Sequence, residues 1–171
     1  MTRDSQRAKV YAAEEFVRTM FDRAAQRGNP VVEFFGTHLT LPPEARFSSA
    51  EAVQRYVDDV LAVPAVRDRW PAVSPLRVRS RRGSTAAHYE CDAGGATMAV
   101  PDRAGGWALR ELVVLHEIAH HLSTESADPG PAHGPAFVAT FCELAAAVMG
   151  PEVAHVLRVV FAKEGAKEGA R

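Results

Sequence analysis

An apolar run that carries two histidines occupies residues 112–122 and reads LVVLHEIAHHL. It contains the pattern HExxH, with His116 and His120 four positions apart and Glu117 directly after the first. Residues four apart on an α-helix lie on the same face, so both imidazoles can point at one ion. The spacing therefore predicts a helix that holds a zinc ion with a carboxylate beside it.

The residue types in this pattern suit metal-assisted hydrolysis. Neutral imidazoles are good ligands for Zn²⁺, and a catalytic site uses three protein ligands and leaves the fourth position to water. The ion lowers the pKa of that water to about 7, and a neighbouring carboxylate can take its proton. We therefore expect one zinc ion per chain, Glu117 as the general base, and a third ligand elsewhere.

Apolar residues surround the motif on two helical faces: Leu109, Leu112 and Val113 on one, and Leu115, Ile118 and Leu122 on the other. Such a helix is buried on most sides. Two histidines in a buried helix are costly as polar groups without partners, and a metal ion would satisfy them. The alternative is that they are core histidines satisfied by protein partners.

The third ligand is expected downstream, where residues 132–137 read AHGPAF. Pro135 indicates the start of a second helix, because the missing N–H of proline is not needed there. His133 lies at helical spacing from a mostly apolar face of that helix. Glu143, the alternative ligand, is turned about 80° from this face at 100° per residue.

HEIAH followed by HGPAF resembles the paired motifs of the SprT-like (Spartan-type) zinc metallopeptidases, over about residues 95 to 145. The chain is also similar to a family of small, uncharacterised bacterial HExxH metallohydrolases. The resemblance implies a zincin-like fold with His116, His120 and His133 as ligands and Glu117 as general base. The chain differs in having only two cysteines, Cys91 and Cys142, too few for the zinc ribbon that SprT proteins often carry.

Composition indicates a cytoplasmic protein of one domain. The chain has 171 residues, 47% of them hydrophobic, and a formal net charge of −1, so no global field would recruit nucleic acid or a membrane. It has no signal-peptide pattern and no apolar run long enough to span a bilayer. We expect a single domain over residues 1–163 and a disordered charged tail over residues 164–171.

The order of periodic segments predicts the α+β class, with helices packed on a small, mostly antiparallel sheet. Helices are expected over residues 4–27, from Ser48 with a capping box to Glu51, and around residues 153–161, and one strand over residues 31–41. From residue 76 the period changes to two, which predicts a meander of three strands over residues 76–81, 86–91 and 96–100.

Substrate binding is expected on this meander. An edge strand beside the site can pair with an extended peptide or protein substrate, and the candidates are residues 86–91 and the strand Ala96, Thr97, Met98, Ala99 and Val100. Tyr89 and His121 are candidates for stabilising the oxyanion or for supporting the ligands.

Four arginines are candidates for contact with nucleic acid as a partner: Arg77, Arg79, Arg81 and Arg82. They could contact phosphates. Charge on an edge strand also prevents sheets from aggregating, and no interleaved aromatic residues suggest base stacking.

The function expected from these patterns is that of a zinc-dependent metallopeptidase, which cleaves peptide or other amide bonds by attack of zinc-bound water with the help of Glu117. One alternative is a DNA-associated, SprT-like protease that nucleic acid activates. The other is a zinc-binding interaction module without turnover.

Overall fold

The computed structural model of the chain describes residues 4–83, 86–102, 109–125 and 130–169. They form two compact units, Met1–Pro43 with Ala127–Arg171, and Glu44–Ser126. Helices and small sheets together confirm the predicted α+β class. Among the described helices, none combines the length and the apolar character needed to cross a membrane. The single domain over residues 1–163 stays a prediction.

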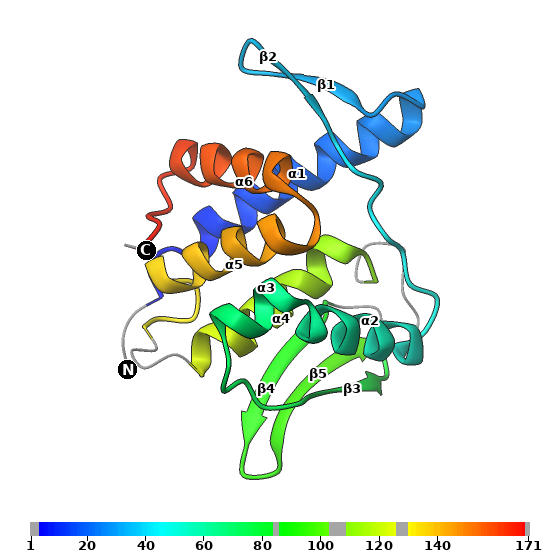
Figure 1. The fold of residues 1–171 in the computed structure, drawn as a ribbon, viewed down its shortest axis with the longest axis vertical. Helices are drawn as coiled ribbons and strands as arrows, with labels where there is room; N and C mark the ends of the chain where they lie inside the picture. Colours follow the sequence, from blue (N-terminus) through cyan, green and yellow to red (C-terminus); the bar gives the residue numbers. More distant parts are fainter. Residues whose placement is uncertain (1–3, 84–85, 103–108, 126–129, 170–171) are drawn as a thin grey trace. The chain divides into compact units, whose positions relative to one another are not determined.

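The described part of the first unit contains three helices and a hairpin. Helices α1 (Arg7–Arg27), α5 (Pro135–Val148) and α6 (Pro151–Lys163) pack together, with α6 against both of the others (Figure 1). Pro135 and Pro151 each stand at a helix start, as predicted for α5. Buried aromatic rings join α5 to α6, with the ring centroids of Phe141 and Phe161 6.2 Å apart.

The predicted single strand over residues 31–41 is a hairpin of two strands, β1 (Val31–Phe34) and β2 (Thr37–Thr40). Phe35 and Gly36 form the turn, with φ of 47° and 79°. Two consecutive positive φ values are typical of the hairpin turn whose twist matches that of the strands. The turn was not foreseen because phenylalanine is an unusual residue at such a position.

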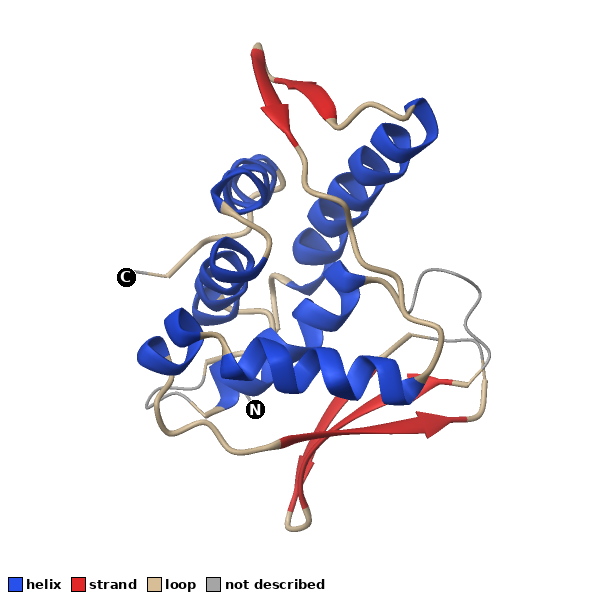
Figure 2. Ribbon diagram, turned by 45° about the vertical axis from the view of Figure 1, so that its right-hand side comes forward, coloured by secondary structure: helices blue, strands red, loops and turns tan. Residues whose placement is uncertain are grey.

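The second unit consists of α2 (Ala50–Ala62), α3 (Pro64–Arg69), β3 (Leu76–Arg81), β4 (His88–Asp92), β5 (Gly95–Pro101) and α4 (Glu111–Thr124). Helix α2 contacts β3 and helix α4 contacts β4, and the two helices lie over one face of the sheet (Figure 2). The N-cap of α2 is Ser49, which accepts a hydrogen bond from Ala52 N, one residue later than the predicted Ser48.

The strand order of the three-stranded sheet is β3-β5-β4, so the predicted meander is wrong. Strands β4 and β5 form the expected antiparallel pair through the turn at Gly94, but β3 pairs with β5 in parallel. The central strand is therefore β5. Two of the three described strand pairings are antiparallel, and the sheet that lies beside α4 is mixed.

The predicted disorder of residues 164–171 is wrong for the part that the structure describes, residues 164–169. Ala166 is buried, and the backbone N–H groups of Lys167 and Gly169 donate hydrogen bonds to the side chain of Gln6 and the carbonyl of Pro135. A polar composition predicts disorder only where no partner is present. Residues 170–171 lie outside the described chain.

Candidate metal site

The start of α4 is fixed by a buried carboxylate. Arg110, the N-cap residue, donates hydrogen bonds to both carboxylate oxygens of Glu44, at 2.8 and 2.6 Å. Glu44 also accepts the N–H of Leu112 in the first turn, at 3.2 Å. A carboxylate satisfies the unpaired N–H groups of a helix start and interacts favourably with the helix dipole. The segment before α2 therefore anchors the helix that carries HExxH.

Two of the predicted ligands lie together on α4. Nearly every residue of this helix is buried, as its apolar faces predicted, and His116 is 4% exposed while His120 is partly exposed. Their Nε2 atoms are 3.0 Å apart. Tetrahedral coordination at about 2.0–2.1 Å would set two ligand nitrogens about 3.3 Å apart. The spacing of the pair therefore suits a shared ion.

Glu117 follows His116 on the same helix and is 6% exposed. Its side chain is thus largely removed from bulk water.

His133 lies in a tight turn before α5, closed by a hydrogen bond from Gly134 N to Pro131 O of 2.8 Å. A Cβ on residue 134 would lie 2.9 Å from Pro131 Cδ and 3.0 Å from its carbonyl oxygen, so this turn requires glycine. The imidazole is 5% exposed and lies between two aromatic rings, those of Tyr11 and Phe137, each with its centroid 5.2 Å away.

The protonation pattern of the His133 ring follows from its neighbour. Nδ1 lies 2.7 Å from the Oδ2 atom of Asp4. A carboxylate only accepts hydrogen bonds, so Nδ1 carries the proton and donates it. In the neutral ring the lone pair is then on Nε2, which is the form in which histidine binds a metal ion through Nε2.

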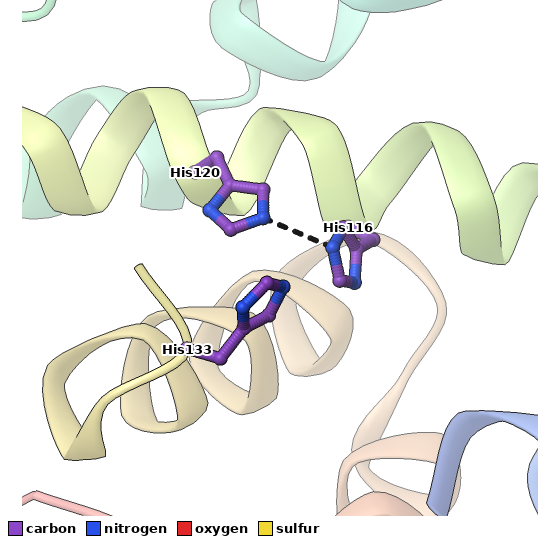
Figure 3. Close-up of side chains that lie close together, drawn as sticks. All are labelled: His116, His120 and His133. Carbon is purple, nitrogen blue, oxygen red and sulfur yellow. Dashed lines mark hydrogen bonds between the residues drawn. The ribbon is translucent and has the colours of Figure 1, made fainter. Parts of the chain in front are cut away.

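The three predicted histidines lie close enough to hold one metal ion. One ligand atom from each of His116, His120 and His133 lies within 4.8 Å of the others, and their rings converge (Figure 3). Over the described ranges this is the one group of three or more potential ligands, and Glu143 is not part of it. Three neutral imidazoles are a donor set that fits Zn²⁺.

His121 follows His120 on α4 and is fully buried. Its Nε2 is 2.8 Å from the carbonyl oxygen of Ser74 and its Nδ1 is 3.3 Å from the hydroxyl of Tyr89. Because a carbonyl only accepts, Nε2 donates and the neutral ring accepts from Tyr89 through Nδ1. The carboxylate of Glu125 lies 4.0 Å from Nδ1 and binds the backbone N–H and the hydroxyl of Ser74.

Tyr89 lies on β4, with its ring nearly parallel to that of His120, at 16° and a centroid distance of 6.4 Å. Burial raises the pKa of Tyr89, so the phenol keeps its proton at neutral pH. The hydroxyl proton points at His121 in this arrangement. Tyr89 therefore contacts His121 through a hydrogen bond and His120 through its ring.

The predicted substrate strand, Ala96 to Val100, is not available at an edge. These residues of β5 pair with β3 on one side and with β4 on the other. A central strand has no unpaired backbone groups to offer a peptide. The expectation for residues 96–100 is thus corrected, and within the described chain no strand pairs with the outer edge of β4.

The arginines of β3 lie on the sheet face opposite its buried side. Arg77 is exposed, as is Arg82 just after the strand, and Arg79 forms a two-pronged ion pair with Glu90 of β4, at 3.1 and 2.9 Å. Hydrogen bonding from Arg79 lowers the pKa of Glu90. The carboxylate of Glu90 neutralises part of the positive charge that this face would need in order to bind phosphates.

The second unit contains a cavity of about 710 Å³ whose lining includes neither His116 nor His120. It lies beside the connection from α3 to β3 and shares Ser74 with the hydrogen bonds around His121; its lining includes Asp58, Leu61, Arg67, Asp68, Trp70 and Ser74.

Sequence reasoning missed the residues that surround His133 and His121. Asp4, Gln6 and Tyr11 come from the beginning of the chain, and Ser74 and Glu125 are separated by 51 positions. No local pattern links residues so far apart. Only the proximity of Asp4 and Gln6 to a helix start was visible, and that is ordinary capping composition.

No family model, curated protein or solved structure matches this chain.

Proposed function

We propose that this chain is a zinc-dependent hydrolase with a zincin-like fold that cleaves peptide or other amide bonds. The observation that carries the proposal is the convergence of one ligand atom from each of His116, His120 and His133 within 4.8 Å. The SprT-like relationship is part of the proposal and rests on the motifs HEIAH and HGPAF.

A catalytic role for the ion is favoured over a structural one by the number of ligands. Structural zinc sites use four protein ligands, whereas catalytic sites use three and keep one position for water or substrate. The described residues supply three histidines and no fourth histidine, cysteine or carboxylate in the same group. This count supports turnover over an interaction module.

When bound, the ion would supply Lewis acidity, polarising the substrate carbonyl and lowering the pKa of a water molecule. Glu117 would remove the proton from that water as it attacks the carbonyl carbon. The same carboxyl group would then deliver the proton to the leaving nitrogen, so that the C–N bond breaks to an amine and a carboxylic acid. His133 would stay in the Nδ1–H form through Asp4.

The outer edge of β4 is the place that suits an extended substrate. Tyr89 on this strand faces His120, so a peptide paired with β4 would run beside the ligand pair. Strand addition supplies backbone hydrogen bonds and holds a peptide in an extended form that exposes its carbonyls. Of the two strands that the sequence offered for substrate binding, the proposal therefore uses residues 86–91 and not residues 96–100.

The test is the pair of variants Glu117→Gln and Glu143→Gln, assayed with a peptide library and for bound zinc. Glu117→Gln should retain zinc and lose turnover, because the amide cannot accept the proton of water. Glu143→Gln removes a carboxylate of α5 that is not part of the histidine group, so this variant should keep both zinc and turnover. Full turnover in Glu117→Gln would sink the mechanism.

A further inference from the structure

The N-terminal segment contacts His133 at two points. Asp4 Oδ2 lies 2.7 Å from the Nδ1 atom of the ring, and Gln6 Nε2 donates to the main-chain carbonyl of His133 at 3.2 Å. Asp4 thus contacts the imidazole of His133, and Gln6 contacts the backbone of the same residue. Gln6 is 7% exposed, so its amide is held inside the unit.

Gln6 is itself held by the C-terminal segment. Its Oε1 accepts the N–H of Lys167 at 2.6 Å, and its Nε2 donates to the carbonyl of Lys167 at 3.2 Å. Two positions further on, Gly169 N donates to the carbonyl of Pro135 at 2.8 Å, immediately after the turn that contains His133. Residues 167–169 therefore fix both Gln6 and the start of α5.

The contacts from Asp4 and Gln6 restrict the tautomer, the ring orientation and the backbone position of His133. An imidazole can carry its proton on either nitrogen and can rotate about its side-chain torsions, and a carboxylate on Nδ1 selects one tautomer and one ring orientation. The backbone bond from Gln6 limits movement of the turn. A ligand that is orientated in advance loses less conformational freedom when the ion binds.

We propose that Asp4 is the positioning residue that presents Nε2 of His133 to the metal ion, and that Gln6, held by residues 167–169, keeps the turn in place. The inference rests on the proposed function, because it takes His133 to be a zinc ligand. It adds a role for two segments at opposite ends of the sequence that no motif marks.

The first measurement is the zinc affinity of the full chain, by competition with a chromophoric chelator. Asp4→Ala should bind zinc about 10- to 100-fold more weakly, the range found when an outer hydrogen-bond partner of a ligand is lost. Asp4→Asn should fall between Asp4→Ala and wild type, because its amide oxygen can still accept from Nδ1 without the charge. Glu15→Gln is the control, since it removes an exposed carboxylate from α1 and should bind zinc as wild type does.

Gln6→Met is the second variant, because it keeps the length of the side chain and removes its hydrogen bonds. It should also weaken zinc binding, by less than Asp4→Ala, since the imidazole keeps its carboxylate. Urea unfolding of each metal-free variant shows whether the unit is intact.

The second measurement separates positioning from simple stability. Nitrogen-15 NMR of the histidines in the metal-free full chain should show His133 with its proton on Nδ1 in wild type and in Glu15→Gln, and a mixture of tautomers in Asp4→Ala. A merely structural role for Asp4 would change the unfolding curve and leave the tautomer of the folded protein unaltered.

The inference is overturned if wild type binds zinc through His116 but Asp4→Ala binds it equally well, or if His133 carries its proton on Nε2 in the metal-free protein. Failure of the proposed function looks different. In that case neither wild type nor His116→Ala binds zinc, and the inference falls with it.

Discussion

The guanidinium of Arg110 binds both carboxylate oxygens of Glu44, and the two side chains are 4% and 5% exposed. The same carboxylate accepts the N–H of Leu112. The helix that carries His116 and Glu117 thus begins at a buried ion pair. Removal of one partner would leave the other charge buried without compensation.

Arg110→Ala should therefore lower the free energy of unfolding by about 3–5 kcal/mol. The matched comparison is Arg79→Ala, which breaks a two-pronged pair with Glu90 whose side chains are both more than 40% exposed. That loss should be about 0–1 kcal/mol, because solvent screens an exposed pair. Urea denaturation of both variants measures the difference, and equal losses would contradict a buried anchor at the start of α4.

Tyr89→Phe should lower stability by about 1 kcal/mol, because the Nδ1 atom of buried His121 loses the hydroxyl that donates to it. Zinc content should not change, since Tyr89 is no ligand in this account. Turnover with a peptide substrate should fall by less than about tenfold. A loss of about 100-fold or more is the size expected of an oxyanion donor and would mean that the hydroxyl turns to the substrate instead.

Stability should fall at high pH through Tyr56. Its hydroxyl donates to Glu111 at 2.5 Å, and burial, followed by the charge of Glu111, raises the pKa of Tyr56. The unfolded chain has the ordinary value of about 10, so above that pH the unfolded state loses this proton first. The contribution of this group is complete below about pH 10 and declines above it, by up to about 1.4 kcal/mol per pH unit.

The difference in unfolding free energy between wild type and Tyr56→Phe isolates this effect from other groups that titrate at high pH. The advantage of wild type should be constant from pH 7 to 9 and should shrink from pH 10 to 11. An advantage that stays constant over the whole range would show that the pKa of Tyr56 is the same in both states.

Removal of metal should destabilise the protein. The Nε2 atoms of His116 and His120 face each other at 3.0 Å in a mostly buried helix, and an ion satisfies both. A ligand present at about 1,000 times its dissociation constant stabilises by about 4 kcal/mol, which is on the order of 10 °C in Tm for a chain of this size. Thermal unfolding with and without a chelator measures the shift. His116→Ala should show no shift, and an unshifted wild type would argue against a metal.

The parts of the site that depend on neighbouring residues were predictable from the sequence. HExxH specifies its own geometry once it is helical, and Pro135 marks the start of α5 after the glycine that the His133 turn requires. The convergence of His133 with the HExxH pair was expected from the spacing and is found in the structure. The helical geometry of HExxH and the start of α5 rest on the helical repeat and on backbone sterics, which act within a few residues.

The parts that depend on distant residues were not predictable. Asp4 and His133 are 129 positions apart, and Gln6 and Lys167 are 161 apart. Strand order has the same difficulty, because the pairing of β3 with β5 depends on a crossover and not on either strand's own pattern. The segment over residues 164–169 has the composition of a disordered tail, but two hydrogen bonds between Lys167 and the side chain of Gln6 hold it in place.

The central claim is that His116, His120 and His133 bind one zinc ion, and the most direct test is elemental analysis of protein purified without added zinc. Wild type and His38→Ala, which changes an exposed histidine of β2, should each carry about one zinc per chain. His133→Ala should carry far less. Absence of metal from wild type, or a metal content indifferent to His133, would contradict the account.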